Sequence, residues 1–364
     1  MSPIYLPEYE WCLIMGITFF LWNLFWVRPR FGSCASALLA YAGFSSIWVW
    51  EWVQNRYYSI NVYDQMALRY FSADSLAKLL LILGPMLWLS ENRKKLFSVG
   101  RFLAFGYVIL NSWAILLSKI FTGCYAVNSC GGIGGNPSIS VSLMVSLLPL
   151  TIRSWKEDWS KVLLVFAAVI ISKSSIGLGL LAMYLGLEIL RKRAFFYALA
   201  ASIVPLALGA LYLSPATLFD SSSRFMIWKF MMQRWAAPWN IPFGTGLGTF
   251  HVFSVNLQNV KGLPLIAEGS HWNTFHNDWL QMLFEGGVLG IGLFILVFLS
   301  AVVKGFRSGE SKTVDSLLLF GTFMALNPAL HFPIPAFFGA WLFTYALRKE
   351  EFRQINTDEG VSYA

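Results

Sequence analysis

Long apolar blocks repeat from one end of this chain to the other, and they constrain its fold more than any other feature. Most blocks hold about 16 to 25 residues, which is the length that an α-helix needs to cross a bilayer. Only 13% of the 364 residues are charged, about half the share found in an average soluble domain. This composition excludes an ordinary cytosolic enzyme, a disordered protein and a soluble nucleic-acid-binding domain. It predicts an all-α, polytopic integral membrane protein.

The hydropathy pattern predicts about 11 membrane-spanning helices, with 10 to 12 as the range. Each should be helical, because a backbone in hydrocarbon must satisfy its own hydrogen bonds. The whole chain, 1–364, is expected to form one integral domain. The expected spans are 10–27, 31–53, 76–90, 96–118, 137–152, 161–172, 175–190, 194–214, 279–303, 316–331 and 334–347.

The distribution of Lys and Arg predicts the orientation of these spans. With the N-terminus outside, 18 of the 27 basic residues fall on the inner side. Four of the other nine lie in one long loop, and long loops escape the positive-inside rule. We therefore expect an outer N-terminus and an inner C-terminus. The net charge of +8 then reflects topology and gives little reason to expect a nucleic-acid partner.

A long outer loop, 215–278, is the most promising place for function, because a loop of this length in a compact domain is usually functional. Ser222-Ser223 can cap a helix over 224–237 that stops before Pro238. Its aromatic residues share one face, so it should lie in the membrane interface. Arg224 and Arg234 extend its polar side, where they could also bind a lipid phosphate.

Neither a metal nor a nucleotide cofactor is expected. His271 and His276 are five residues apart, unlike the i, i+4 pair of a zinc helix. The run 244–248 has neither the third glycine of a dinucleotide fold nor a Walker lysine, so we interpret it as a turn that closes the backbone on itself. Cys124 and Cys130 share an outer loop, and whether they form a disulfide stays open.

The segment from His276 to Gly290 is the most informative part of the sequence, since it joins the long loop to the ninth span. His276 lies at the water boundary beside Asn277 and Asp278, where it could transfer a proton near a phosphate. Asp278 and Gln281 fit a capping box, which would make Asp278 structural.

Two further features of this segment lie deeper in the expected span. Glu285 is a functional candidate because an ionisable residue inside a span is costly, although a buried pairing with Arg or Lys would also explain it. Gly286 and Gly290 present a small face for close helix packing.

Taken in order, these motifs resemble the O-antigen ligase and O-antigen polymerase superfamily, which includes bacterial O-linked oligosaccharyltransferases. His-Asn-Asp-Trp-Leu-Gln at 276–281 and Glu-Gly-Gly-Val-Leu-Gly at 285–290 look like its signature. Gly-Asn-Pro at 135–137 and Ser-Lys-Ser-Ser-Ile-Gly at 172–177 resemble two further elements, with Lys173 in place of the usual arginine. Ser223-Arg224, Trp228 and the run 242–248 resemble a fourth.

The resemblance implies a metal-independent glycosyltransferase with a GT-C-like fold, resident in the bacterial inner membrane and active in cell-surface polysaccharide assembly. It would move a glycan from undecaprenyl diphosphate, on the periplasmic face, to lipid A core of lipopolysaccharide, another lipid-linked glycan or a protein hydroxyl. Which acceptor, which sugar and which oligomeric state apply stays open. His276 would be the general base, and Lys173 and Arg224 would bind the diphosphate. Asn277, Asp278, Arg234 and Glu285 would support them.

Two other classes remain open at this point. A polytopic transporter of a small solute or anion could use Lys173 and Glu285 inside the membrane, but no paired, interrupted helices of an inverted repeat are visible. A membrane scaffold without catalytic activity is the third interpretation.

Overall fold

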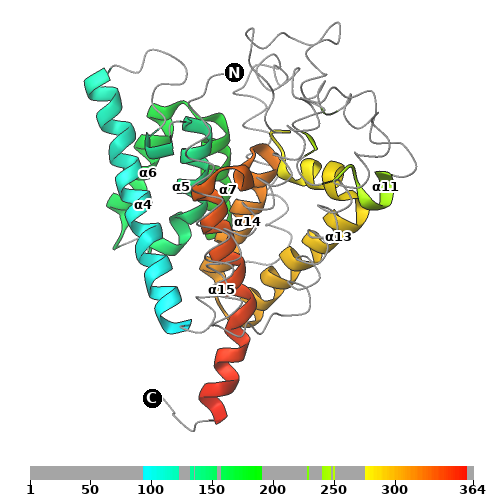
Figure 1. The fold of residues 1–364 in the computed structure, drawn as a ribbon. Helices are drawn as coiled ribbons and strands as arrows, with labels where there is room; N and C mark the ends of the chain where they lie inside the picture. The colour runs from blue at the N-terminus through cyan, green and yellow to red at the C-terminus, as the bar shows by residue number, and fades with distance from the viewer. Residues whose placement is uncertain are drawn as a thin grey trace, which may run out of the picture. The chain divides into compact units, whose positions relative to one another are not determined.

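The computed structural model describes residues 93–122, 132–134, 136–153, 157–190, 228, 240–246, 249–250 and 275–358 (Figure 1). Throughout these residues the secondary structure is helical, with no strand. The chain divides into two compact units, each described by itself: 1–92 with 219–299, and 93–218 with 300–364.

Helices lie at the expected spans wherever the structure describes the chain, except that the helix of the span expected at 316–331 begins at Ser311 and ends at Leu326. They are α4 (Arg93–Thr122), α5 (Pro137–Thr151), α6 (Trp159–Ser172), α7 (Ser175–Leu190), α13 (Asp278–Arg307), α14 (Ser311–Leu326) and α15 (Pro333–Asp358). Shorter elements are η2 (Gly132–Gly134), α11 (Asn240–Phe243) and η3 (Ala329–His331). The spans expected at 10–27, 31–53, 76–90 and 194–214 lie outside the described residues.

Within the part of the chain that the structure describes, two stretches are long and apolar enough to cross a membrane by length and composition, Ser98–Phe121 and Asp278–Arg307. The first stretch belongs to α4, whose side chains are buried and exposed in the reverse of the pattern that a helix of a soluble protein shows. Asn111 and Ser112 are fully buried, whereas Phe102, Ile120 and Phe121 are 72%, 72% and 79% exposed. A face of large apolar side chains with polar groups turned inward suits contact with lipid and is costly in water.

The centre of the second unit is α5, which contacts α4, α6, α7 and α14. Asn136 caps its start, because the Asn136 side chain accepts from the Ser138 and Ile139 N–H groups. Pro137 follows at the first helical position, where proline is favoured. Serine hydroxyls of α5 donate to carbonyls of the preceding helical turn. For example, Ser146 Oγ donates to the Ser142 carbonyl at 2.8 Å, so a buried hydroxyl has a hydrogen-bond partner.

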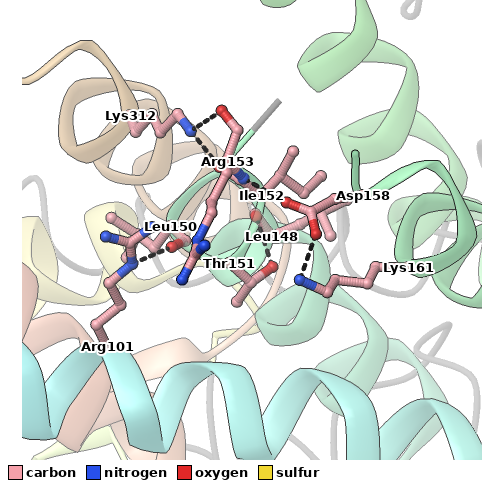
Figure 2. A network of polar contacts seen from close by, with 9 residues as sticks. All are labelled: Arg101, Leu148, Leu150, Thr151, Ile152, Arg153, Asp158, Lys161 and Lys312. Carbon is pink, nitrogen blue, oxygen red and sulfur yellow. Dashed lines mark hydrogen bonds and ion pairs between the residues drawn. The ribbon is translucent and has the colours of Figure 1, made fainter. Parts of the chain in front are cut away.

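Basic side chains gather where α5 ends, as Figure 2 shows. The Arg101 Nε atom of α4 donates to the Leu150 carbonyl at 2.9 Å. The Lys312 Nζ atom of α14 donates to the carbonyls of Ile152 and Arg153, the second at 2.8 Å. These bonds satisfy carbonyls that have no partner within the helix, and they place cations at the negative end of the α5 dipole.

Asp158 ties the same end of the unit to α6. Its carboxylate accepts from Lys161 Nζ at 2.5 Å and from the Arg153 N–H at 2.6 Å. These two hydrogen bonds, the lysine first, hold the pKa of Asp158 below its ordinary value of 3.8. Figure 2 shows that this carboxylate lies between Arg153 and Lys161, beside the end of α5.

We expect Lys312→Met to lower the thermal stability of the protein by about 1–2 kcal/mol, because two charge-assisted hydrogen bonds to carbonyls disappear while the side-chain volume stays. Melting of the purified protein in detergent measures this effect. The matched control is Arg307→Met, since Arg307 is an exposed basic residue at the end of α13. Equal melting temperatures for wild type and Lys312→Met would show that these bonds contribute nothing net.

The lowered pKa of Asp158 also predicts a pH dependence of stability. A carboxyl group whose pKa is lower in the folded state stabilises that state above its ordinary pKa and loses this contribution as protons bind. Stability should therefore fall as the pH drops below about 4. The slope of melting temperature against pH in this range should be shallower in Asp158→Asn, and identical slopes would contradict the assignment.

Candidate functional site

The segment that begins α13 lies in the first unit and carries the histidine selected from the sequence. Asn277 caps the helix: its Oδ1 atom accepts from the Leu280 N–H at 3.0 Å, and its carbonyl accepts from the Gln281 N–H at 3.0 Å. The capping box that the sequence predicted between Asp278 and Gln281 is therefore wrong by one residue. Asp278 is instead the first helical residue and is 1% exposed.

His276 is held in a left-handed backbone conformation, with φ at 54°. Such a conformation is uncommon for a residue other than glycine, and it tends to occur where function requires a fixed geometry. The side chain of His276 is partly exposed, whereas Phe275 before it is 1% exposed. The chain thus turns a histidine out of a buried segment and fixes it beside a capped helix start.

Two hydrogen bonds hold the backbone of Phe275, the residue directly before His276, one at its carbonyl and one at its N–H. The Phe275 carbonyl accepts from the indole Nε1 of Trp228, at 2.7 Å. The Phe275 N–H donates to Gln281 Oε1, at 3.2 Å. Trp228 belongs to the interfacial helix expected over 224–237, and this residue is itself helical, while the rest of that range lies outside the described residues.

An aromatic cluster lies beneath this anchor. The ring of Phe275 is 4.5 Å from the ring of Phe250 and 5.3 Å from that of Phe284, measured between centroids. Phe250 and Phe284 meet edge to face at 6.4 Å. All three side chains are almost fully buried, so the cluster joins the end of the long loop to the first arm of α13.

The helix α13 is broken at Gly287, where φ is 63° and ψ is −169°. Trp279 and Phe294 would lie about 22 Å apart along a straight helix, yet their ring centroids are 5.1 Å apart. The chain therefore bends sharply at Gly287, as the yellow part of α13 shows in Figure 1. The single span expected at 279–303 is wrong in this respect: Asp278–Gly286 forms a short arm and the long apolar helix begins after it.

The glycine turn that follows α11 docks into this break. The N–H groups of Thr245 and Gly246 donate to the carbonyls of Phe284 and Glu285, at 2.9 and 2.8 Å. In an unbroken helix these carbonyls would bond to residues four positions later. A bond from the Thr249 N–H to the Gly246 carbonyl, 3.3 Å, agrees with the turn expected here, and the two bonds to α13 are contacts that the sequence did not predict.

Two glycines permit this close approach of two backbones. A Cβ atom on Gly244 would lie 2.3 Å from the Glu285 carbonyl oxygen, and one on Gly287 would lie 2.4 Å from the Gly244 nitrogen. Both residues have positive φ angles, 76° and 63°, which side chains rarely allow. The packing role assigned to Gly286 and Gly290 from the sequence thus has a counterpart at Gly287, between them.

Glu285 lies in the short arm and is 5% exposed. Its Oε1 atom accepts from Gln281 Nε2 at 3.1 Å and from the Phe250 N–H at 3.3 Å. This carboxylate therefore connects the arm to the loop residue Phe250. The sequence selected Glu285 for its charge, but these two contacts are to an amide side chain and a backbone N–H.

Lys173, described within the second unit, ends α6 in a left-handed conformation with φ at 53°. Its side chain is exposed, and its N–H donates to the Ile170 carbonyl at 3.1 Å. Ser174 then caps α7, since its Oγ atom accepts from the Gly177 N–H at 3.1 Å. The two helices, expected over 161–172 and 175–190, are thus joined by a short turn at Lys173 and Ser174.

Several candidates fall outside the described residues. They are Arg224, Arg234, Cys124, Cys130 and His271. Among the residues that the structure describes, no cluster of three or more His, Cys, Asp or Glu side chains could hold a metal ion.

Sequence reasoning missed the roles of Gln281, Trp228 and Gly287. The signal for Gln281 was present, since a glutamine in the first turns after an Asn cap can reach back to a preceding N–H. The signal for Gly287 was the Gly-Gly pair itself, which weakens a helix interior.

Comparison of the chain with protein-family models gave no match, and neither did comparison with curated proteins. The function must therefore be argued from the chemistry of the site. The site offers a partly exposed imidazole on a fixed backbone, directly before the partly buried first arm of α13.

Proposed function

We propose that this chain is a membrane glycosyltransferase that moves a glycan from undecaprenyl diphosphate to a hydroxyl acceptor on the outer face of the membrane. The observation that carries the proposal is the left-handed, partly exposed His276 beside the Asn277 cap. This is the histidine of the His-Asn-Asp motif on which the resemblance rests. A base with a fixed backbone favours proton transfer, because orientation lowers the barrier.

The proposed reaction is a substitution at the anomeric carbon. His276 accepts the proton of the acceptor hydroxyl, whose oxygen forms the new glycosidic bond as the bond to the diphosphate oxygen breaks. The leaving diphosphate gains negative charge, which Arg224 would stabilise by bidentate hydrogen bonds. The resemblance assigns Lys173 to the same anion. No redox cofactor is required, because no electrons are gained or lost.

Membrane topology is a second part of the proposal, with about 11 spans in an inner membrane. The basic end of the second unit supports the orientation: Arg101, Arg153, Lys161 and Lys312 gather around the end of α5. Lys304, in the same unit, donates to the Leu347 carbonyl. Such a concentration of Lys and Arg is typical of a cytoplasmic side.

Proteoliposomes test the proposed reaction against the transporter alternative. The purified chain is mixed with undecaprenyl-diphosphate-linked glycan and a candidate acceptor, either lipid A core, a second lipid-linked glycan or an acceptor peptide. Transferase activity consumes the lipid-linked glycan and yields a new glycosidic product, identified by mass spectrometry. Solute flux across the vesicles without any loss of lipid-linked glycan would contradict the proposal and favour a transporter.

Arg224→Ala should lower the rate of transfer by about 100-fold, because one charged partner of the developing anion is lost. Arg224→Lys should recover part of the rate, since lysine keeps the charge but loses the planar fork. By the same reasoning Lys173→Arg should be tolerated. The control is Lys229→Ala, which removes another basic residue of the same expected helix. A wild-type rate in Arg224→Ala would remove Arg224 from the site.

A further inference from the structure

A continuous path of hydrogen bonds leads from the loop, through two buried polar side chains, to the backbone of Phe275, the residue directly before the candidate base. The Phe250 N–H and Gln281 Nε2 both donate to Glu285 Oε1, at 3.3 and 3.1 Å. Gln281 Oε1 in turn accepts from the Phe275 N–H, at 3.2 Å. Phe275 is the residue directly before His276.

Both side chains of this path are buried, so their polar atoms need hydrogen-bond partners within the protein. Gln281 is 3% exposed and Glu285 is 5% exposed. A buried polar group that loses its partner costs free energy comparable to its desolvation. Gln281 uses both ends of its amide, one as donor and one as acceptor, so only one orientation of the amide satisfies both neighbours.

The backbone that this path holds is itself strained. The positive φ of His276, 54°, is uncommon for a residue with a side chain and persists only where surrounding contacts enforce it. The residues on either side of His276 supply such contacts: the Gln281 and Trp228 bonds to Phe275, and the Asn277 cap. Of these, the Gln281 bond to Phe275 leads on through Glu285 to the loop.

We propose that Gln281 is a positioning residue that fixes the His276 backbone, and that Glu285 orients the Gln281 amide for this task. The expected effect on kcat rests on the proposed function, whereas the expected effect on the His276 backbone does not. Gln281 acts through Phe275 and has no contact with a substrate in this scheme. Glu285 then serves as a fixed acceptor, and its role differs from the ion-pathway role that an intramembrane carboxylate would suggest.

Exchange of the two side chains gives a sharp test, because donors and acceptors can be balanced in one arrangement and not in another. In Gln281→Glu, two carboxylates face each other with no N–H between them. The bond to position 285 is lost while both are ionised, so the variants are compared across a pH series, because one shared proton would restore it. In the wild type a single atom, Glu285 Oε1, accepts both bonds. In the double variant Gln281→Glu/Glu285→Gln, a small rotation of the amide at position 285 lets its Nε2 donate to the new carboxylate while its Oε1 accepts from the Phe250 N–H. Each bond of the path then has a donor and an acceptor again.

Transfer kinetics with undecaprenyl-diphosphate-linked glycan give the first measurement, on the full chain in proteoliposomes. We expect Gln281→Glu to lower kcat by about 100-fold with little change in KM, because a misplaced base slows the chemical step. Glu285→Gln alone should lose little, and the double variant should recover most of kcat. Leu283→Ala is the control, since it removes half-buried volume from the same arm without touching the path.

Modification of His276 by diethyl pyrocarbonate gives the second measurement, followed by mass spectrometry and independent of turnover. The rate should rise in Gln281→Glu and return toward wild type in the double variant. If the double variant is no better than Gln281→Glu in either measurement, the positioning role is wrong. If modification behaves as expected while wild type transfers no glycan, the positioning role stands and the proposed function falls.

Discussion

Loss of the His276 imidazole should abolish glycan transfer, with a decrease in kcat of about 100- to 10,000-fold, the range typical of removing a general base. Two substitutions separate the chemistry from the backbone. In His276→Ala the left-handed conformation, φ 54°, becomes an additional cost. His276→Asn tolerates that conformation far better and still provides no base. Both variants should be inactive, whereas only His276→Ala should also lose some stability.

The measurement is the rate of product formation per mole of inserted protein, with abundance quantified in the same membranes. The partly exposed position of His276 means that its loss opens no core cavity, so the protein should remain abundant. Asp278→Asn is measured beside it. A small loss of activity in Asp278→Asn would not reflect a change in helix capping, because Asn277 caps α13. Wild-type turnover in a well-inserted His276→Asn preparation would place the base elsewhere.

The helices themselves followed closely from the sequence. The expected ranges 137–152, 161–172 and 175–190 coincide with α5, α6 and α7 to within about two residues. Hydropathy works well here because a backbone in hydrocarbon has few alternatives to a helix. Capping residues sharpen the ends, since Asn136 and Ser174 both accept from N–H groups of the helices that follow them.

The geometry around the candidate site residues was not predictable from the sequence, and their chemical roles stay a prediction. The choice of His276 and Lys173 required only motif and placement, and both residues also have positive φ angles. The Gly286-Gly287 pair was a weak signal for the break in α13, because a glycine pair lowers helix propensity without saying whether the chain bends there. Likewise, the partner of the glycine turn lies about forty residues away, at Phe284 and Glu285. Local patterns do not encode a contact of that separation.

Gly287→Ala should destabilise the protein by about 3 kcal/mol or more. The new Cβ atom would lie 2.4 Å from the Gly244 nitrogen and 2.5 Å from the Pro242 carbonyl. These are backbone atoms, so no side-chain rotation relieves the clash. The conformation at φ 63° and ψ −169° adds strain for any residue other than glycine. The glycine turn should leave the break, and the Phe284 and Glu285 carbonyls would lose its two N–H donors.

Gly292→Ala is the matched control, because Gly292 lies in the same helix and no atom of the described residues is within 4 Å of the place that a Cβ atom would take there. Alanine at this position should be neutral or slightly stabilising, as alanine is the better helix former. Thermal melting and abundance in membranes measure both variants. Gly244→Ala should resemble Gly287→Ala, since its Cβ atom would meet the Glu285 carbonyl from the opposite side. If Gly287→Ala melts like Gly292→Ala, the loop does not dock into the break, and the path that holds His276 loses its support.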